Sequence, residues 1–228
     1  MCLHSSRFDS LTQFEYKQNV ETRVGYFFTS GSYYWLIDGN TIPSQQNRGG
    51  KLPFGFRGDA SFFRQWKGCE DNTIVPMVIV VDGNGIELKY LIYNLKNQSW
   101  SDRPLKASED SAFHKIKLYS GFETLDTILN LANIKQSSEE LGDESLFIIS
   151  TAKNKSIYYD WIWLNGCPHK NGSFKGETIQ FFGGLLEEVF WKMDKSVDAA
   201  MVYFSYSSPK SRFTQKIGFC EKTLNIFK

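Results

Sequence analysis

The sequence predicts an α+β protein, in which a mainly antiparallel sheet carries two principal amphipathic helices. Aromatic and β-branched runs separated by glycine-containing turns indicate antiparallel hairpins. Two later stretches place apolar residues at helical spacing, which predicts helices over Leu125–Lys135 and Thr178–Met193. The order of elements in the first half recurs in the second, so residues 1–228 are expected to form either one globular domain or two duplicated halves with a boundary near residue 110.

The first hairpin is predicted over Arg23–Thr29 and Ser32–Asp38, because both segments are rich in aromatic and β-branched residues. Ser30 and Gly31 between them supply a tight turn that glycine permits. The polar segment Pro43–Gly50, which contains paired glycines, is expected to be a loop.

A short helix is predicted next, after a possible N-cap at residues 58–61, since Phe62, Phe63 and Trp66 fall on or near one helical face. A second hairpin follows over Thr73–Val81 and Ile86–Tyr93, with glycines between them to provide positive φ angles. The polar stretch that comes after it is interpreted as a connector between the two halves.

The second half begins with a strand and the first principal helix, and a hairpin and the second helix follow. The paired glycines Gly183 and Gly184 weaken that second helix. The last segment, residues 212–227, fits either a strand or a short helix. The remaining strands are expected over Phe113–Tyr119, Glu144–Thr151, Ser156–Leu164 and Val197–Tyr206.

Charge and hydropathy exclude two classes of partner. The chain has 26 Lys and Arg against 25 Asp and Glu, for a formal net charge of +1, so it lacks the positive field that drives nucleic-acid binding. Its longest apolar run, Ile74–Val81, is far shorter than the roughly 18 residues of a membrane span, and residues 1–10 lack an export signal. We therefore expect a cytoplasmic protein that binds neither nucleic acid nor membrane.

The titratable residues form no recognisable catalytic or metal-binding constellation. Cysteine and histidine pair twice, in Cys2-Leu3-His4 and Cys167-Pro168-His169, but neither pair has the spacing of a structural zinc site. No glycine-rich phosphate loop is present. The sequence thus predicts no catalytic residue, no metal and no cofactor, and it favours a protein that is not an enzyme.

The aromatic content indicates recognition instead, because Phe, Tyr and Trp together make up 16% of the chain. Side chains alternate across a strand, so one face of each aromatic strand can join a core while the other presents rings to a partner. The alternative is that both faces are covered. The residues predicted to bind a partner lie in or beside these strands and are Tyr34, Trp35, Asp38, Asp160 and Trp163.

One motif resembles a known class of proteins. An aromatic strand that ends in tryptophan, two residues, aspartate and glycine covers Arg23–Gly39, and a looser version covers Ser156–Gly166. A polar loop and a predicted helix follow each. This order is similar to that of immunity proteins of bacterial polymorphic-toxin and contact-dependent inhibition systems. The resemblance implies a non-catalytic partner that neutralises a cognate toxin by occluding its surface. The alternative is a small cytosolic hydrolase with an unidentified active site.

Overall fold

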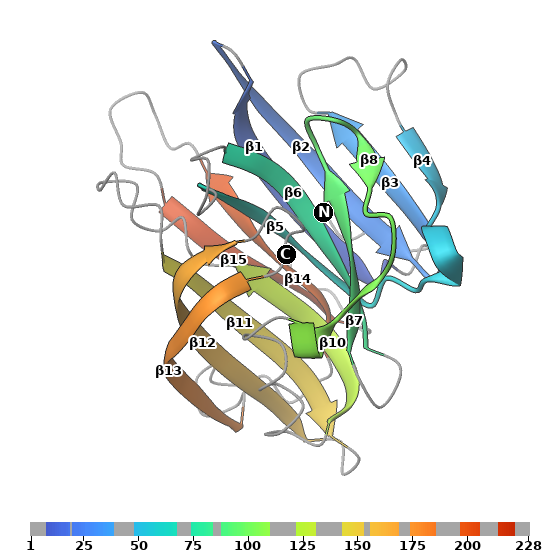
Figure 1. Ribbon diagram of the computed structural model, residues 1–228. Coiled ribbons are helices and arrows are strands. Elements are labelled where there is room, and N and C mark those ends of the chain that lie inside the picture. The colour runs from blue at the N-terminus through green and yellow to red at the C-terminus, as the bar shows by residue number, and fades with distance from the viewer. Residues whose placement is uncertain are drawn as a thin grey trace.

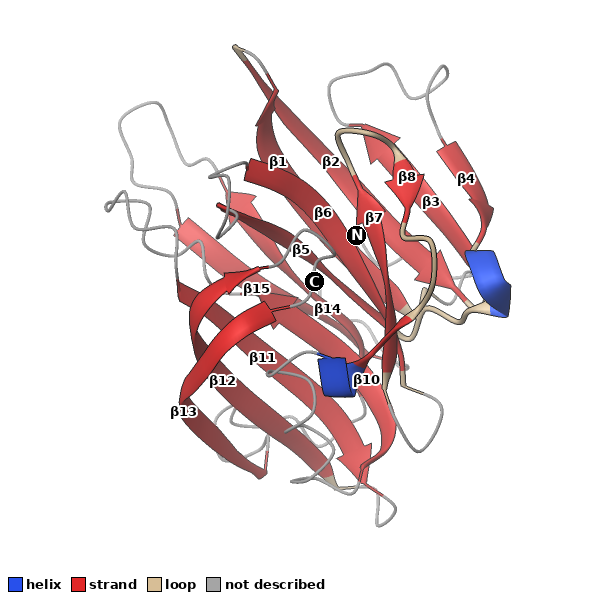
Figure 2. Cartoon of the chain, viewed as in Figure 1, coloured by secondary structure: helices blue, strands red, loops and turns tan. Residues whose placement is uncertain are grey.

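Antiparallel strands make up nearly all the regular structure in the computed structural model (Figures 1 and 2). The only helical segments among the described residues are two short 3-10 turns, Pro53–Gly55 and Ala107–Glu109. The structure describes residues 8–18, 20–38, 48–67, 74–83, 88–109, 122–130, 143–152, 156–168, 174–185, 197–205 and 214–221.

Two four-stranded meanders, in which each strand pairs with the next, form the outer sheets. The first sheet contains β1 (Ser10–Gln18), β2 (Glu21–Ser30), β3 (Tyr33–Asp38) and β4 (Arg48–Lys51). The third sheet contains β10 (Phe122–Asn130), β11 (Asp143–Ala152), β12 (Ile157–Pro168) and β13 (Phe174–Leu185).

The middle sheet lies between them in the chain, and a separate hairpin follows the third sheet. The middle sheet contains β5 (Ala60–Lys67), β6 (Ile74–Asp82), β7 (Lys89–Asn94), β8 (Ser99–Trp100) and β9 (Leu105–Lys106). The hairpin consists of β14 (Val197–Ser205) and β15 (Thr214–Glu221).

The two halves share an order of strands. In each, a four-stranded meander is followed by an antiparallel pair, β5–β6 in the first half and β14–β15 in the second. Their contacts also correspond, because β5 and β14 each contact both β1 and β10. A common ancestral unit for the two halves stays a prediction that this correspondence supports.

Two hydrophobic cores lie on opposite faces of the middle sheet. The first core joins this sheet to the first sheet through side chains such as Phe27, Val80 and Leu91. The second core joins it to the third sheet through Ile79 and Ile148 among others. Because successive residues of β6 enter different cores, the whole strand is apolar, which explains the continuous apolar run in the sequence.

The predicted α+β class is wrong, and the first principal helix shows why. Residues 122–130 form β10, which pairs with β11, whereas residues 131–135 lie outside the described residues. A register shift between Leu125 and Thr127 inserts an extra residue, so Leu125 and Ile128 enter the same core although they are three positions apart. A bulged strand thereby reproduces the apolar spacing of a helix.

The second principal helix is also wrong over the described residues. Residues 174–185, which include the first part of the predicted Thr178–Met193 helix, form β13. In this strand Gly183 and Gly184 lie opposite Asp160 and Tyr159 of β12. A register shift occurs here too, opposite Trp163. Residues 186–193 lie outside the described residues.

The short helix predicted after residue 58 is strand β5. Phe62 enters the second core and Phe63 enters the first, so the adjacent rings point to opposite faces of a sheet that is buried on both sides. Asp59 caps no helix; its Oδ2 accepts a hydrogen bond from the backbone N–H of Gly83 at 2.8 Å.

The predicted hairpins are confirmed by strand pairing. β2 pairs with β3 across a turn in which Gly31 has a φ of 57°, and β11 pairs with β12. β6 pairs with β7, but the centre of that turn, residues 84–87, lies outside the described residues. The predicted strand over residues 113–119 also lies outside them, and the ambiguous C-terminal segment contains β15.

Candidate binding surface

The first sheet has one apolar face in the first core and one aromatic face exposed. Strand alternation sends Phe27 and Leu36 into the core and their neighbours to the other side. Tyr33 is 55% exposed there, and Tyr26 and Trp35 are each 36% exposed. Large rings at this exposure are typical of protein interaction sites. The rings that share this side, here called the aromatic face, are Phe8, Tyr26, Phe28, Tyr33 and Trp35.

The rings of the aromatic face contact one another. Phe28 and Trp35 lie opposite each other on β2 and β3 and stack with centroids 5.4 Å apart and planes 14° apart. Phe8 meets Phe28 edge to face at 4.8 Å, and Tyr33 lies 6.4 Å from Trp35. Such pairs restrict ring rotation, so less side-chain entropy is lost when a partner binds.

Gly49 makes room for the indole ring of Trp35. The two residues are cross-strand partners on β4 and β3. A Cβ atom at residue 49 would lie 2.8 Å from Cδ1 of Trp35 and 3.0 Å from the carbonyl oxygen of Tyr34. The absence of a side chain at Gly49 therefore lets the indole lie against the β4 backbone.

The turn that precedes Tyr33 is fixed by contacts from three other segments. Asp9 Oδ2 accepts a hydrogen bond from the N–H of Gly31 at 2.5 Å. The N–H of Gly58 donates to the carbonyl of Gly31 at 3.0 Å, and the N–H of Leu52 donates to the carbonyl of Ser32 at 2.8 Å. These bonds hold the start of β3, and with it Tyr33, in place.

The structure separates the five predicted binding residues. Trp35 belongs to the aromatic face. Tyr34, its neighbour, is half-buried on the opposite side, where its ring packs against Trp100 at 5.1 Å. Asp38 ends β3 and Trp163 lies within β12, but their side chains fall outside what the structure describes.

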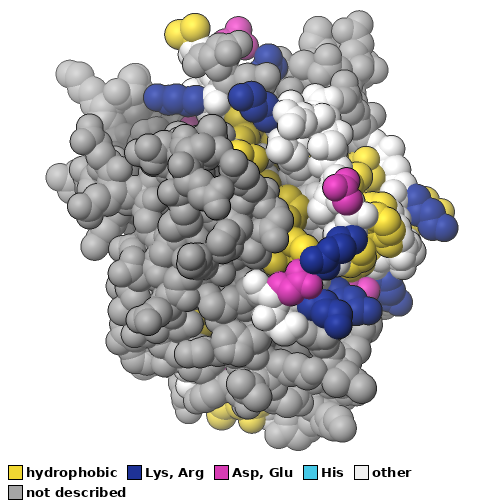
Figure 3. Space-filling view, viewed as in Figure 1, with side chains coloured by type: hydrophobic (Ala, Val, Ile, Leu, Met, Phe, Trp, Pro, Cys, Tyr) yellow, Lys and Arg dark blue, Asp and Glu magenta, His cyan; other side chains and the backbone are white. Residues whose placement is uncertain are grey.

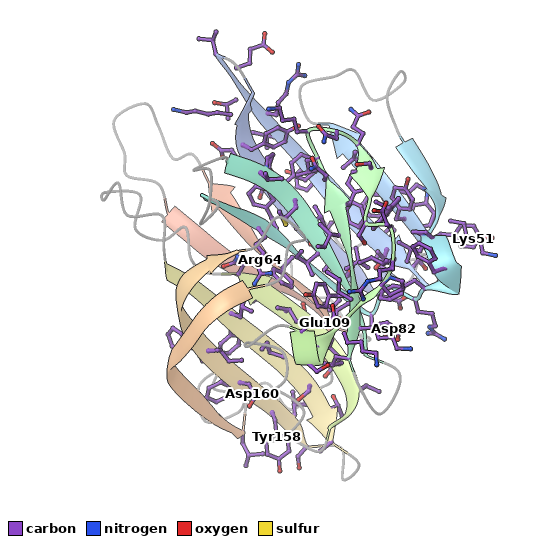
Figure 4. All side chains as sticks on the ribbon, in the orientation of Figure 1. Lys51, Arg64, Asp82, Glu109, Tyr158 and Asp160 are labelled. Atoms are coloured by element: carbon purple, nitrogen blue, oxygen red, sulfur yellow. The ribbon has the colours of Figure 1, made fainter. Side chains whose placement is uncertain are left out.

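Asp160 does not lie on any surface, because its side chain is 0% exposed. It pairs with Ile148 on β11 and shares its face of β12 with Ile162, so it points into the second core (Figure 4). Neither carboxylate oxygen has a hydrogen-bond partner among the described residues. Burial raises the pKa of Asp160 to about 7, since the apolar core disfavours the charged form.

A second ionisable side chain points into the same core. Arg64 of β5 is fully buried, and its guanidinium carbon lies 5.8 Å from the centre of the Phe62 ring (Figure 4). A cation at this distance from an aromatic face is stabilised by the ring electrons. The second core thus contains two ionisable groups from different sheets.

Sequence reasoning missed part of the exposed surface. Phe28 and Tyr33 are absent from the predicted binding residues, although alternation and strand pairing put them on the same face as Trp35. Phe54 was missed entirely: it is 59% exposed and has a φ of 60°, between the buried residues Leu52 and Phe56. The proline before it and the glycine after it are the signal that could have indicated a tight turn there.

Comparison with known proteins gives no family to assign. A scan against protein-family models found no match, and a search of curated proteins found none either. Among the described residues, none of the helices is long and apolar enough to cross a membrane. Over the same part of the chain, no group of three or more potential metal ligands is found.

Proposed function

We propose that this chain binds another protein through the aromatic face of the first sheet. The observation that carries the proposal is the exposure of Tyr33 and Trp35 within a fixed array of contacting rings. Tyrosine and tryptophan dominate the energetics of many protein interfaces, because they bury large apolar areas while losing little conformational entropy. A sheet face with fixed rings provides such anchors already in place.

A bacterial toxin is the partner that the aromatic-strand motif of Arg23–Gly39 suggests; the helix expected after that motif is strand β5, so this part of the proposal rests on the motif alone. An inhibitor of this kind acts by occupying the toxin's surface, so it needs affinity and no catalytic residues of its own. Because a small free fraction of toxin would be harmful, the complex is expected to have a Kd of about 1 nM or lower.

The alternative, a small hydrolase, draws its support from Asp160. A carboxyl group with a pKa of about 7 can donate or accept a proton near neutral pH. Its side chain is buried among isoleucines of the second core, however, so a substrate would reach it only if the sheets separated. The aromatic face needs no such change to meet its partner, and it supports the binding function better.

The test uses the protein encoded beside this chain as the partner. Tyr33→Ala and Trp35→Ala should each weaken its binding by 2 kcal/mol or more, about 30-fold in Kd, as measured by isothermal titration calorimetry. Val20→Ala is the control, because Val20 is a fully exposed apolar residue in the turn before β2, at the end of that strand away from Tyr33. Equal affinity for all the proteins would contradict the proposal, provided that circular dichroism shows each to be folded.

A further inference from the structure

Strand β4 forms one edge of the first sheet, because it pairs with β3 and with no other described strand. The direction of its backbone groups follows from one hydrogen bond, in which the N–H of Leu52 donates to the carbonyl of Ser32. Hydrogen-bonded and non-hydrogen-bonded pairs alternate along an antiparallel ladder. The N–H and C=O groups of Gly50 therefore point toward β3, and those of Gly49 and Lys51 point away from the sheet.

These two outward-pointing residues also lie on the side of the aromatic face. Gly49 lies opposite Trp35, and Lys51 lies opposite Tyr33. A strand added beside β4 would therefore place one side chain next to Gly49, within reach of the indole of Trp35. Two residues further along, its next side chain on that side would lie beside the exposed Lys51.

The stretch of chain that contains β4 carries charge of one sign. Residues 39–58 contain Arg48, Lys51 and Arg57 and no acidic residue, although the whole chain has a net charge of only +1. In Figure 3, basic side chains lie at the margin of the molecule near β4, and other basic side chains lie beside acidic ones further toward its lower part. Such a stretch attracts acidic segments and repels a second copy of itself, as charged edge strands do in many sheets.

The turn that follows β4 presents Phe54 in a strained conformation. A positive φ is costly for a residue with a side chain and persists only where the surroundings enforce it. Here the buried side chains of Leu52 and Phe56 fix the turn on both sides, while Phe54 itself is 59% exposed. The fold thus presents an apolar ring in continuation of the free edge.

We propose that the edge of β4 binds an extended acidic segment of the partner protein as an added strand, with a bulky residue beside Gly49 and an acidic residue beside Lys51. Phe54 provides an apolar contact where that segment leaves the sheet. This inference rests on the proposed protein-binding function and specifies the chemistry of the partner. Strand addition obtains affinity from backbone hydrogen bonds and specificity from alternate side chains.

The direct test is amide hydrogen exchange followed by NMR. The probe is a capped peptide of alternating threonine and glutamate with one central phenylalanine. We expect the amide groups of Gly49 and Lys51 to exchange rapidly in the free protein and to become protected when the peptide is added. The amide groups of Gly50 and Leu52 should be protected in both states. Absence of new protection at Gly49 and Lys51 would overturn the proposal.

Charge reversal tests the electrostatic part. Lys51→Glu should weaken binding of the glutamate peptide about tenfold in fluorescence anisotropy, since an attraction becomes a repulsion. Lys96→Glu makes the same charge change at an exposed turn beyond β7 and should leave binding unchanged. A peptide with lysine in place of glutamate should bind the unaltered protein more weakly; equal binding of the two peptides would also overturn the proposal.

The outcomes for the edge and for the aromatic face are separable. If the edge amides gain no protection but Trp35→Ala still weakens binding of the natural partner, the edge proposal fails and the protein-binding function stands. If the peptide protects the edge while the aromatic-face variants retain full affinity for that partner, the aromatic face is not the binding site and the edge proposal stands.

Discussion

Gly83, just after β6, lies so close to Leu125 of β10 that a Cβ atom added at residue 83 would be 2.7 Å from the Cβ atom of Leu125. The contact joins the middle sheet to the third sheet at a point where the N–H of Gly83 also donates to Asp59. The φ of Gly83 is not positive, so the lack of space, and not the backbone conformation, requires glycine here.

Gly83→Ala should therefore destabilise the fold by about 1–3 kcal/mol, because an added methyl group overpacks the contact with Leu125. Urea unfolding followed by circular dichroism measures the change. Gly31→Ala is the comparison, because Gly31 has open space around it but a φ of 57°. This substitution should lower the unfolding free energy by about 1 kcal/mol, the cost of a positive φ in alanine. If Gly83→Ala is as stable as the unaltered protein, the middle and third sheets lie further apart at this point than the contact between Gly83 and Leu125 indicates.

Asp160→Asn should stabilise the protein at neutral pH. The folded-state pKa of about 7 lies above the ordinary value of 3.8, so the native state binds the proton more tightly than the unfolded state does. Stability from the protonated carboxyl is therefore complete below about pH 4 and is lost as the pH rises toward 7. At 1.36 kcal/mol per pKa unit, the unfolding free energy that this group contributes below pH 4 and loses above pH 7 is at most roughly 4 kcal/mol.

The measurement is the unfolding free energy of both proteins between pH 4 and pH 8. The curve of the unaltered protein should fall over this range relative to that of Asp160→Asn, and the two should converge at the acid end. Parallel curves would mean that the carboxyl is ionised in the folded protein, with a partner that stabilises its charge.

Gly49→Ala should disturb the aromatic face, because the added methyl group would meet the indole of Trp35 and the carbonyl of Tyr34. The expected results are a changed near-ultraviolet circular dichroism spectrum and weaker binding of the natural partner. Gly50→Ala provides the matched control, since its Cβ would meet only the ring of Tyr34, at 3.3 Å, on the other side of the sheet. Identical spectra for the two variants would contradict the packing of Trp35 on Gly49.

Asp9→Ala should loosen the turn before Tyr33 by removing the acceptor for the N–H of Gly31. The loss of a partly buried hydrogen bond is expected to cost about 1 kcal/mol and to speed amide exchange at Gly31. Asp102→Ala is the control, because Asp102 is an exposed aspartate in a bend on another sheet. Exchange at Gly31 that is as slow as in the unaltered protein would show that the other contacts suffice to fix the turn.

The sequence predicts the hairpins of this protein better than it predicts its layers. Alternation and turn residues indicate which strands pair, as at Gly31 between β2 and β3. A bulge that inserts one residue between Leu125 and Ile128 gives the same apolar spacing as a helix, and Phe62 followed by Phe63 does not reveal that both faces of β5 are buried. These features depend on neighbouring sheets that local periodicity does not encode.

The candidate surface was predictable to a similar degree. Alternation shows that Tyr34 and Trp35 lie on opposite faces of β3, so they cannot both be exposed on one face, but only tertiary packing decides that Tyr34 is covered and Trp35 is not. Asp160 is an acidic residue within an aromatic strand, and nothing in the neighbouring sequence shows that its side of β12 faces the second core. Exposure of Phe54 depends on a turn whose neighbours are buried by distant strands.

The middle sheet, with a core on each face, also constrains how the chain can fold during synthesis. Strands β5–β7 leave the ribosome before the third sheet, so the side of this sheet that carries Ile79 and Tyr90 has no covering until β10–β12 are made. A chain released at that stage exposes a wide apolar β-surface, which is a common starting point for aggregation. Truncation near residue 110 is therefore expected to yield an insoluble product, whereas the full chain, once complete, protects the same surface.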